Sequence, residues 1–229
     1  AQTQEFLGYL DAWYENLPNA DKETLFQEPQ RCALISVDLI EGFCSIGALA
    51  SPRVAAIVQA VTQLMSSAWA LGVRQFVLSQ DTHAPDALEF GAWPPHCVRG
   101  TQEAETVAAI RALPFFEEMI VIEKNSIDTG MNGDLANWLQ ANPQLDTFIV
   151  VGDCTDLCTY QLAMFLRLHA NENQQNRRVI VPADCVQTYD MPVGTAKELG
   201  AYPHPGDLMH AFFLYHLALN GVEVLQTVQ

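Results

Sequence analysis

Short apolar runs alternate with longer, periodically apolar segments along this chain, and the alternation predicts strands and helices in turn. Apolar runs of strand length occur at residues 32–38, 74–81, 119–124, 147–153, 178–184 and 222–228. Between them, apolar positions recur at helical spacing over residues 54–72, 104–113, 134–142, 159–171 and 207–221. Strands that are apolar on both faces and alternate with helices are typical of a covered parallel sheet. We therefore predict an α/β fold with three layers, built on a doubly wound, mostly parallel sheet of about six strands.

The first 30 residues stand outside this pattern. Residues 6–17, FLGYLDAWYENL, predict a helix that packs outside the core. The remainder has the size of one well-cored domain, and no Ser/Gly-rich or Pro-rich linker divides it. We therefore predict an N-terminal helical extension over residues 1–30 and a single domain over residues 31–229.

Charge and composition narrow the classes of partner. The formal net charge is −16 at pH 7, which repels nucleic-acid phosphates and anionic membrane surfaces. No apolar run approaches the ~18 residues that span a bilayer, and no basic segment precedes an apolar one at the N-terminus. The six cysteines lie mostly in apolar runs, as expected of reduced thiols. We expect a cytoplasmic protein that binds neither nucleic acid nor membrane.

Polar side chains gather at the ends of predicted strands. Asp38, Asp81, Lys124 and Asp153 each stand at or just after the carboxyl end of a strand. In open parallel sheets this edge is where ligand sites are built. A strand-ending aspartate also commonly caps the next helix, and that interpretation stays open for Asp153, Asp156 and Asp184.

Cys158 begins the predicted helix that follows the fourth strand, in the sequence GDCTDLC at residues 152–158. Backbone N–H groups at a helix start stabilise a thiolate, and the preceding turn can aim amides at one point as an oxyanion hole. With Lys124 to favour the thiolate and Asp38 to move its proton, these residue types are sufficient for amide hydrolysis through a thioester. A buried, purely structural cysteine is the alternative.

A second set of residues suits a metal ion. Asp81 and His83 lie two apart on an extended segment, and His96 follows a turn rich in proline, with Asp86 and Glu89 between them. Two imidazoles with carboxylates suit zinc, iron or manganese. Such residues are also common as surface hydrogen-bonding groups, but the stiff WPPHC segment at residues 93–97 favours the metal interpretation.

Taken together, the motifs resemble a known family. They are ISVDLIEGFCSIGALA at 35–50, SQDTHAP at 79–85, WPPHCVRGTQEAE at 93–105, EKNS at 123–126 and VVGDCTDLCTYQLA at 150–163. This combination resembles the nicotinamidases of the isochorismatase-like cysteine hydrolase superfamily, from about residue 32 to the C-terminus. The segment at residues 204–218, HPGDLMHAFFLYHLA, is most similar to the plant-type branch.

The resemblance implies roles for residues of the hydrolytic centre. Cys158 matches the nucleophile, Asp38 the general base and acid, and Lys124 the third member of the triad. A cis peptide bond is implied between Asp153 and Cys154, which would turn the amides of Cys154 and Cys158 toward the substrate oxygen.

It also implies how metal and substrate are held. Asp81, His83 and His96 match the metal-binding side chains, and Glu89 matches a fourth carboxylate ligand. Phe43 and Trp93 match aromatic residues that sandwich a pyridine ring. One divalent ion is implied, with zinc as the first choice and iron or manganese as alternatives.

The predicted function is hydrolysis of nicotinamide, a small pyridine carboxamide, to nicotinate and ammonia in NAD salvage, by a homo-oligomer.

The sequence departs from the family pattern at Glu41-Gly42, where many family members carry Asn-Asp. Three alternative functions stay open: a carbamoyl- or ureido-amide hydrolase without metal, an isochorismatase, which usually lacks the nucleophilic cysteine, and a non-catalytic relative that binds a small amide.

Overall fold

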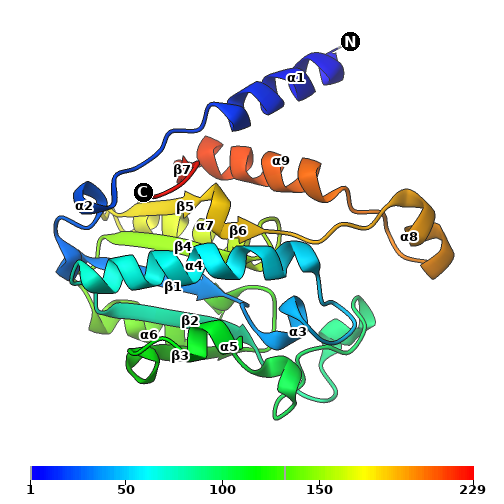
Figure 1. Ribbon diagram of the computed structural model, residues 1–229, viewed down its shortest axis with the longest axis horizontal. Coiled ribbons are helices and arrows are strands. Elements are labelled where there is room, and N and C mark those ends of the chain that lie inside the picture. The colour runs from blue at the N-terminus through cyan, green and yellow to red at the C-terminus, as the bar shows by residue number, and fades with distance from the viewer. Residues whose placement is uncertain (1, 132) are drawn as a thin grey trace.

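A parallel sheet forms the centre of the computed structural model, which describes residues 2–131 and 133–229 (Figure 1). Its strands are β1 (Cys32–Val37), β2 (Gln75–Asp81), β3 (Ile120–Lys124), β4 (Thr147–Asp153), β5 (Arg178–Pro182), β6 (Val186–Gln187) and β7 (Glu223–Leu225). The strand order is β3-β2-β1-β4-β5-β7, and the short β6 pairs with the end of β4. The pairs run parallel. The predicted three-layer, parallel architecture is confirmed.

The two central strands explain why the sheet is covered on both faces. Every residue of β1 and β4 is buried. Because successive side chains point to opposite faces, Leu34 and Ile149 enter one apolar core while Ile35 and Val150 enter the other. Burial on both sides accounts for the uninterrupted apolar runs of the sequence.

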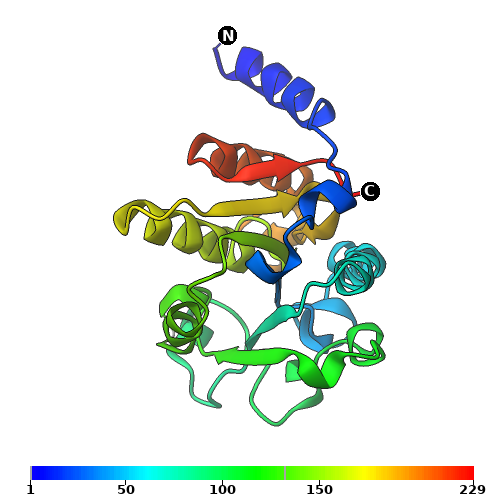
Figure 2. The same cartoon turned by 90° about the vertical axis from the view of Figure 1, so that its left-hand side faces the viewer.

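Helices cover both faces of the sheet (Figure 2). On one face lie α3 (Glu41–Cys44), α4 (Pro52–Ala70) and α5 (Ala108–Arg111), and on the other α6 (Gly133–Ala141), α7 (Cys158–Glu172) and α9 (Gly206–Leu219). A further helix, α8 (Val193–Leu199), projects from one end of the molecule (Figure 1). The short 3-10 turns are η1 (Pro29–Arg31), η2 (Leu88–Gly91), η3 (Gln102–Ala104), η4 (Phe116–Glu118), η5 (Thr129–Met131) and η6 (Ala183–Cys185). Among the described residues, no helix combines the length and apolarity that a bilayer crossing requires.

Two predicted elements are shorter than expected. The helix predicted over residues 104–113 exists only at Ala108–Arg111, and the prediction for residues 104–107 is wrong. The backbone there pairs with the segment after β1 instead: Glu41 N–H donates to Glu105 O at 2.9 Å, and Val107 N–H donates to Leu39 O at 3.1 Å. The strand predicted over residues 222–228 is regular only in β7, after which Val228 forms a bridge with Ala20.

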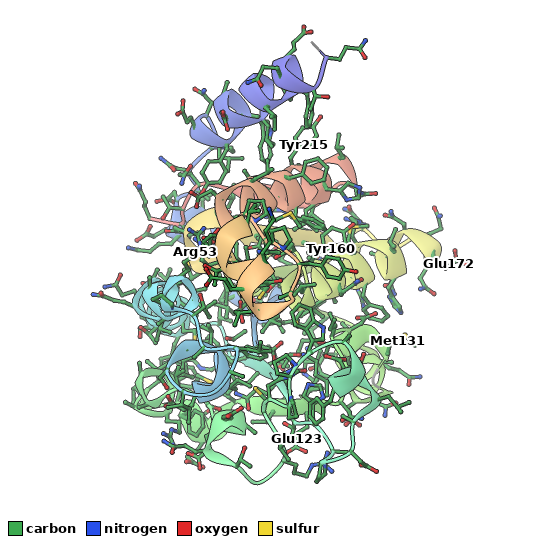
Figure 3. All side chains as sticks on the ribbon, turned by 90° about the vertical axis from the view of Figure 1, so that its right-hand side faces the viewer. Arg53, Glu123, Met131, Tyr160, Glu172 and Tyr215 are labelled. Atoms are coloured by element: carbon green, nitrogen blue, oxygen red, sulfur yellow. The ribbon has the colours of Figure 1, made fainter. Side chains whose placement is uncertain are left out.

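The N-terminal segment forms the predicted helix, α1 (Gln2–Glu15), which lies outside α9 (Figure 1), and a short helix, α2 (Lys22–Leu25), follows it. Figure 3 shows Tyr215 of α9 directed toward α1. Around its ring lie Phe6, Tyr9 and Trp13, at centroid distances of 5.5, 5.9 and 5.3 Å. The division of the chain between residues 30 and 31 stays a prediction.

Gly152 near the end of β4 is fixed by a close approach of two strands. Its φ is +114°, a conformation that favours glycine. A Cβ atom at this position would lie 2.0 Å from the Val37 carbonyl oxygen of β1. Both the backbone angle and the contact therefore exclude a side chain here.

We expect Gly152→Ala to lower the free energy of unfolding by about 2 kcal/mol or more, because it adds strain and a clash with backbone. Gly8→Ala in α1 is the matched control, since nothing lies within 4 Å of its added methyl group. Helix propensity should make that control neutral or more stable by about 0.5–1 kcal/mol. Urea unfolding followed by circular dichroism measures both, and equal midpoints for Gly152→Ala and wild type would contradict this account.

Candidate active site

Three neighbouring strands bring the predicted charged residues together at one edge of the sheet. Asp38 directly follows β1, Asp81 ends β2 and Lys124 ends β3. Asp81 and Lys124 are register partners, and the Asp38 amide donates to Ser79 O at 2.8 Å, so the three side chains start at the same level. All three residues are buried, with Asp38 1% and Lys124 3% exposed.

Lys124 lies between two carboxylates. Its Nζ is 2.8 Å from Asp38 Oδ2, and it also donates to Asp81 Oδ1. Asp38 Oδ1 accepts a hydrogen bond of 2.7 Å from the Asp81 amide. Asp38 itself has a φ of +54°, which is uncommon for a residue with a side chain and concentrates at functional sites. Backbone and ion pairs together hold the Asp38 carboxylate in one orientation.

Cys158 completes this cluster as the first residue of α7. Its sulfur and one carboxylate oxygen each from Asp38 and Asp81 lie within 4.8 Å of one another. The Cys158 thiol therefore lies beside the Asp38 carboxylate. The structure therefore brings together Asp38, Lys124 and Cys158, as the sequence predicted.

The turn before Cys158 has the predicted backbone form. The peptide bond between Asp153 and Cys154 is cis. The Cys154 carbonyl accepts hydrogen bonds of 3.1 Å from the amides of both Leu157 and Thr159. The N-cap residue of α7 is Leu157, and it makes no side-chain cap hydrogen bond, so the alternative interpretation of Asp153 and Asp156 as helix caps is wrong.

Burial and neighbouring charges set the protonation of the triad. Burial raises the pKa of the Cys158 thiol well above its usual range, although Lys124 opposes that shift. Burial, followed by the charge of Asp81, raises the pKa of Asp38 to about 6, against the effect of Lys124. The sequence predicted a resting thiolate, but burial beside two carboxylates favours a thiol. The Asp38 carboxylate lies beside the sulfur and is placed to remove its proton.

The predicted metal-binding side chains also meet. One ligand atom each from Asp81, His83 and His96 lies within 4.8 Å of the others, and all three residues are buried. His83 Nε2 is 3.5 Å from Asp81 Oδ2 and 3.9 Å from Glu89 Oε1, which places Glu89 beside the group. Asp86, by contrast, is exposed and belongs to no such group among the described residues.

The hydrogen bonding of the two histidines leaves ring nitrogens free to bind a metal ion. His96 Nδ1 donates to Pro94 O at 2.8 Å, which leaves its Nε2 lone pair free for a ligand. Both ring nitrogens of His83 are buried without a hydrogen-bond partner among the described residues. Unpaired buried nitrogens are costly, and a bound cation would satisfy one of them. Two imidazoles with carboxylates are a suitable donor set for zinc, iron or manganese.

Of the two predicted aromatic residues, Phe43 contacts this group and Trp93 contacts Tyr189. The ring of Phe43, on α3, is 5.7 Å from that of His96. Trp93 lies edge-on to Tyr189 at 6.2 Å, and Tyr189 stacks on His204 at 3.8 Å. Tyr189 and His204 were not predicted.

The Glu41-Gly42 departure has a local cause. A Cβ on Gly42 would lie 2.6 Å from Cys97 Sγ and 3.0 Å from Glu103 Cβ. Glu103 Oε2 in turn accepts the Cys97 amide at 2.9 Å. The space that an aspartate would need at position 42 is therefore taken by Cys97 and Glu103.

Sequence reasoning also missed the partners of the turn before Cys158. His204 Nε2 is 2.8 Å from Asp156 Oδ2, and His210 Nδ1 is 2.8 Å from Thr155 Oγ1. The only sequence signal was the pair of histidines in HPGDLMH at residues 204–210.

Residues 32–227 match the family model of the isochorismatase domain. The chain belongs to this family. Nicotinamidase 1 of Arabidopsis thaliana is 27% identical over 96% of each chain. Among solved structures, a cysteine hydrolase from Pseudomonas syringae pv. phaseolicola has a TM-score of 0.72 at 23% identity, covering 88% of this chain and 90% of that one. The pyrazinamidase of Pyrococcus horikoshii in complex with zinc has a TM-score of 0.65 at 24% identity, covering 86% and 99%. The predicted family is confirmed.

The N-terminal extension has a counterpart in the Arabidopsis relative. Coverage of 96% leaves only about nine of the 229 residues unaligned, so most of the first 30 residues fall within the alignment. The motifs that carry the family resemblance begin only at about residue 32, so they gave no family counterpart for this segment.

The site predicts that metal binding depends on both histidines. We expect His83→Ala and His96→Ala to lower the bound divalent metal to about a tenth of wild type or less, because each removes one of three buried donors. His169→Ala, on α7, is the control and should keep the metal. Elemental analysis of the purified proteins measures the content, and full occupancy in both variants would make the histidines purely structural.

Proposed function

We propose that the protein is an amidohydrolase that converts nicotinamide into nicotinate and ammonia through a cysteine thioester, in NAD salvage. The single observation that carries the proposal is the grouping of buried Asp38, Lys124 and Cys158 at one edge of the sheet, where Asp38 pairs with Lys124 and lies within 4.8 Å of the Cys158 sulfur. The nicotinamidase from Arabidopsis, aligned over nearly its whole length, supports the substrate class.

The first half of the reaction forms the thioester. Asp38 accepts the thiol proton of Cys158, and the sulfur attacks the carboxamide carbon. The amides of Cys154 and Cys158 would donate to the developing oxyanion. As this intermediate collapses, the C–N bond breaks and Asp38 returns the proton to the leaving nitrogen, so ammonia departs. Lys124 keeps the charge of the site balanced throughout.

The second half releases the acid. Asp38, again ionised, takes a proton from a water molecule that attacks the thioester carbon. The C–S bond then breaks, nicotinate leaves, and the proton on Asp38 returns to the sulfur of Cys158. One carboxylate therefore acts as base and acid in turn, for which a pKa near the working pH is suitable.

Asp81, His83 and His96, with Glu89 beside them, would hold the divalent ion, with zinc as the first choice and iron or manganese as alternatives. A bound ion supplies a Lewis-acid position for the pyridine nitrogen, directly or through water. The zinc complex of the Pyrococcus pyrazinamidase supports this assignment. Phe43 and Trp93 would sandwich the ring.

A carbamoyl- or ureido-amide hydrolase is the principal rival, because it would use the same triad. Such an enzyme has no need of the buried group formed by Asp81, His83 and His96. The two His83 nitrogens, which lack hydrogen-bond partners among the described residues, favour a bound metal ion and therefore an amide substrate that the ion helps to hold. A non-catalytic amide-binding protein would bury three charged groups without using them, at a cost in stability. Cytoplasmic location and homo-oligomeric assembly stay predictions.

The central experiment compares the two cysteines of the turn. Cys158→Ala should lower kcat for nicotinamide by about a thousandfold or more, because it removes the nucleophile. Cys154→Ala should stay within about tenfold of wild type, since its proposed contribution is a backbone amide. Ammonia release measures turnover. The assignment would be reversed if Cys154→Ala were inactive and Cys158→Ala active.

The metal-ligand variants also report on the substrate. If the ion positions the pyridine nitrogen, His83→Ala should raise the KM for nicotinamide by about tenfold or more. Benzamide lacks the ring nitrogen, so its already weaker kcat/KM should fall much less. Steady-state kinetics on both amides provides the comparison. Equal losses on the two would argue for the metal-free class of hydrolase.

A further inference from the structure

Two adjacent residues of the turn before Cys158 are held by histidines from a distant part of the chain. Thr155 Oγ1 bonds His210 of α9 at 2.8 Å, and Asp156 Oδ2 bonds His204, just before α9, at the same distance. All four residues are buried. The turn that leads to the proposed nucleophile is therefore fixed from outside as well as by its own backbone.

The contact through His210 continues to the N-terminal helix. His210 Nε2 lies 3.2 Å from the hydroxyl of Tyr14, which belongs to α1, and the two rings meet edge to face at 5.6 Å. One hydrogen-bonded chain thus runs from α1 through α9 to the catalytic turn: Tyr14, His210, Thr155.

The aromatic contacts of α1 hold Tyr14 in place. Trp13, its neighbour in the chain, packs against Tyr215 of α9 at 5.3 Å, and Phe6 lies 5.5 Å from the same ring. Tyr215 and His210 belong to the same helix. Because α1 and α9 form one packed pair, the Tyr14 hydroxyl reaches His210 from a fixed position.

Because His210 is neutral, both of its hydrogen bonds, to Tyr14 and to Thr155, are needed. Burial, together with the charge of Arg53, lowers the pKa of His210 to about 4, so the ring is neutral and carries a single N–H. One nitrogen donates and the other accepts, and the hydroxyls of Tyr14 and Thr155 can each take either role. Loss of either hydroxyl leaves a buried ring nitrogen without that partner.

We propose that Tyr14 and His210 are positioning residues that hold the oxyanion-binding turn through Thr155, which gives the N-terminal helix a part in catalysis. This inference rests on the proposed function. Thr155 directly follows Cys154, and its own amide donates to Gln187 O at 3.0 Å. The side chain and the backbone of Thr155 are thus both fixed. They in turn fix the direction in which the Cys154 amide points. Oxyanion donors act only when they are aimed in advance, so small displacements lower kcat.

Tyr14→Phe is the direct test, because it removes one hydroxyl and keeps the ring. We expect kcat for nicotinamide to fall roughly three- to tenfold with KM unchanged, as for the loss of one partly buried hydrogen bond. Tyr9→Phe is the matched control on the same helix. Its ring also touches Tyr215, but its hydroxyl has no hydrogen-bond partner among the described residues.

A second readout separates positioning of the turn from a general loss of structure. Alkylation of Cys158 by iodoacetamide needs the sulfur but forms no oxyanion. In Tyr14→Phe its rate should match wild type while hydrolysis slows. Thr155→Val should behave like Tyr14→Phe with a larger loss of kcat, and Thr155→Ser, which keeps a hydroxyl, should recover most of it.

The possible results distinguish failure of this inference from failure of the proposed function. Equal kcat for Tyr14→Phe and Tyr9→Phe in an active enzyme would reject the inference alone. Hydrolysis and alkylation falling by the same factor would also reject it, because the whole site would then have changed. A wild-type protein that releases no ammonia from nicotinamide would reject the proposed function, and this inference with it.

Discussion

The ion pairs of Lys124 are the interaction on which the site depends. Asp38 and Asp81 end adjacent strands of a parallel sheet, so the fold itself places two carboxylates in a buried space. Without a cation between them, like charges at this distance would force one carboxylate to take up a proton. Although burial lowers the pKa of the Lys124 ammonium, the two carboxylates raise it well above its usual range overall. Lys124 therefore keeps the Asp81 carboxylate ionised beside His83, while it holds the Asp38 carboxylate beside the Cys158 thiol.

Much of this arrangement could be predicted from the sequence because it follows from topology. Parallel strands end at a common edge, so the sequence could place Asp38, Asp81 and Lys124 at one edge of the sheet. That the three residues meet there follows from the neighbouring positions of β1, β2 and β3, which only the structure shows. The helix start at Cys158 and the spacing of Asp81, His83 and His96 are equally local features. The resemblance added the cis peptide bond, which no pattern of apolar residues contains. The roles that it implies for Phe43 and Trp93 stay predictions.

What escaped prediction depends on tertiary surroundings. The apolar residues at 104–107 had helical spacing, but the segment after β1 took their backbone hydrogen bonds. The protonation of Cys158 depends on full burial beside Asp38, which no spacing reveals. His204 and His210 stood in the sequence as ordinary residues around the start of a helix. Their partners, Asp156 and Thr155, lie about 50 residues away, and only the folded chain brings them together.

The packing of α1 on α9 ties the catalytic turn to segments that are remote in the sequence. Tyr14 and His210 are 196 positions apart, and the bridge between Ala20 and Val228 joins similarly distant segments. The entropy of closing a loop rises slowly with its length, so this separation adds little to the cost of the contact. Local opening of α1 would break the contact while the sheet and its charged edge stay folded. Such an opened molecule would keep every residue of the triad in place and lose the outer support of the turn before Cys158.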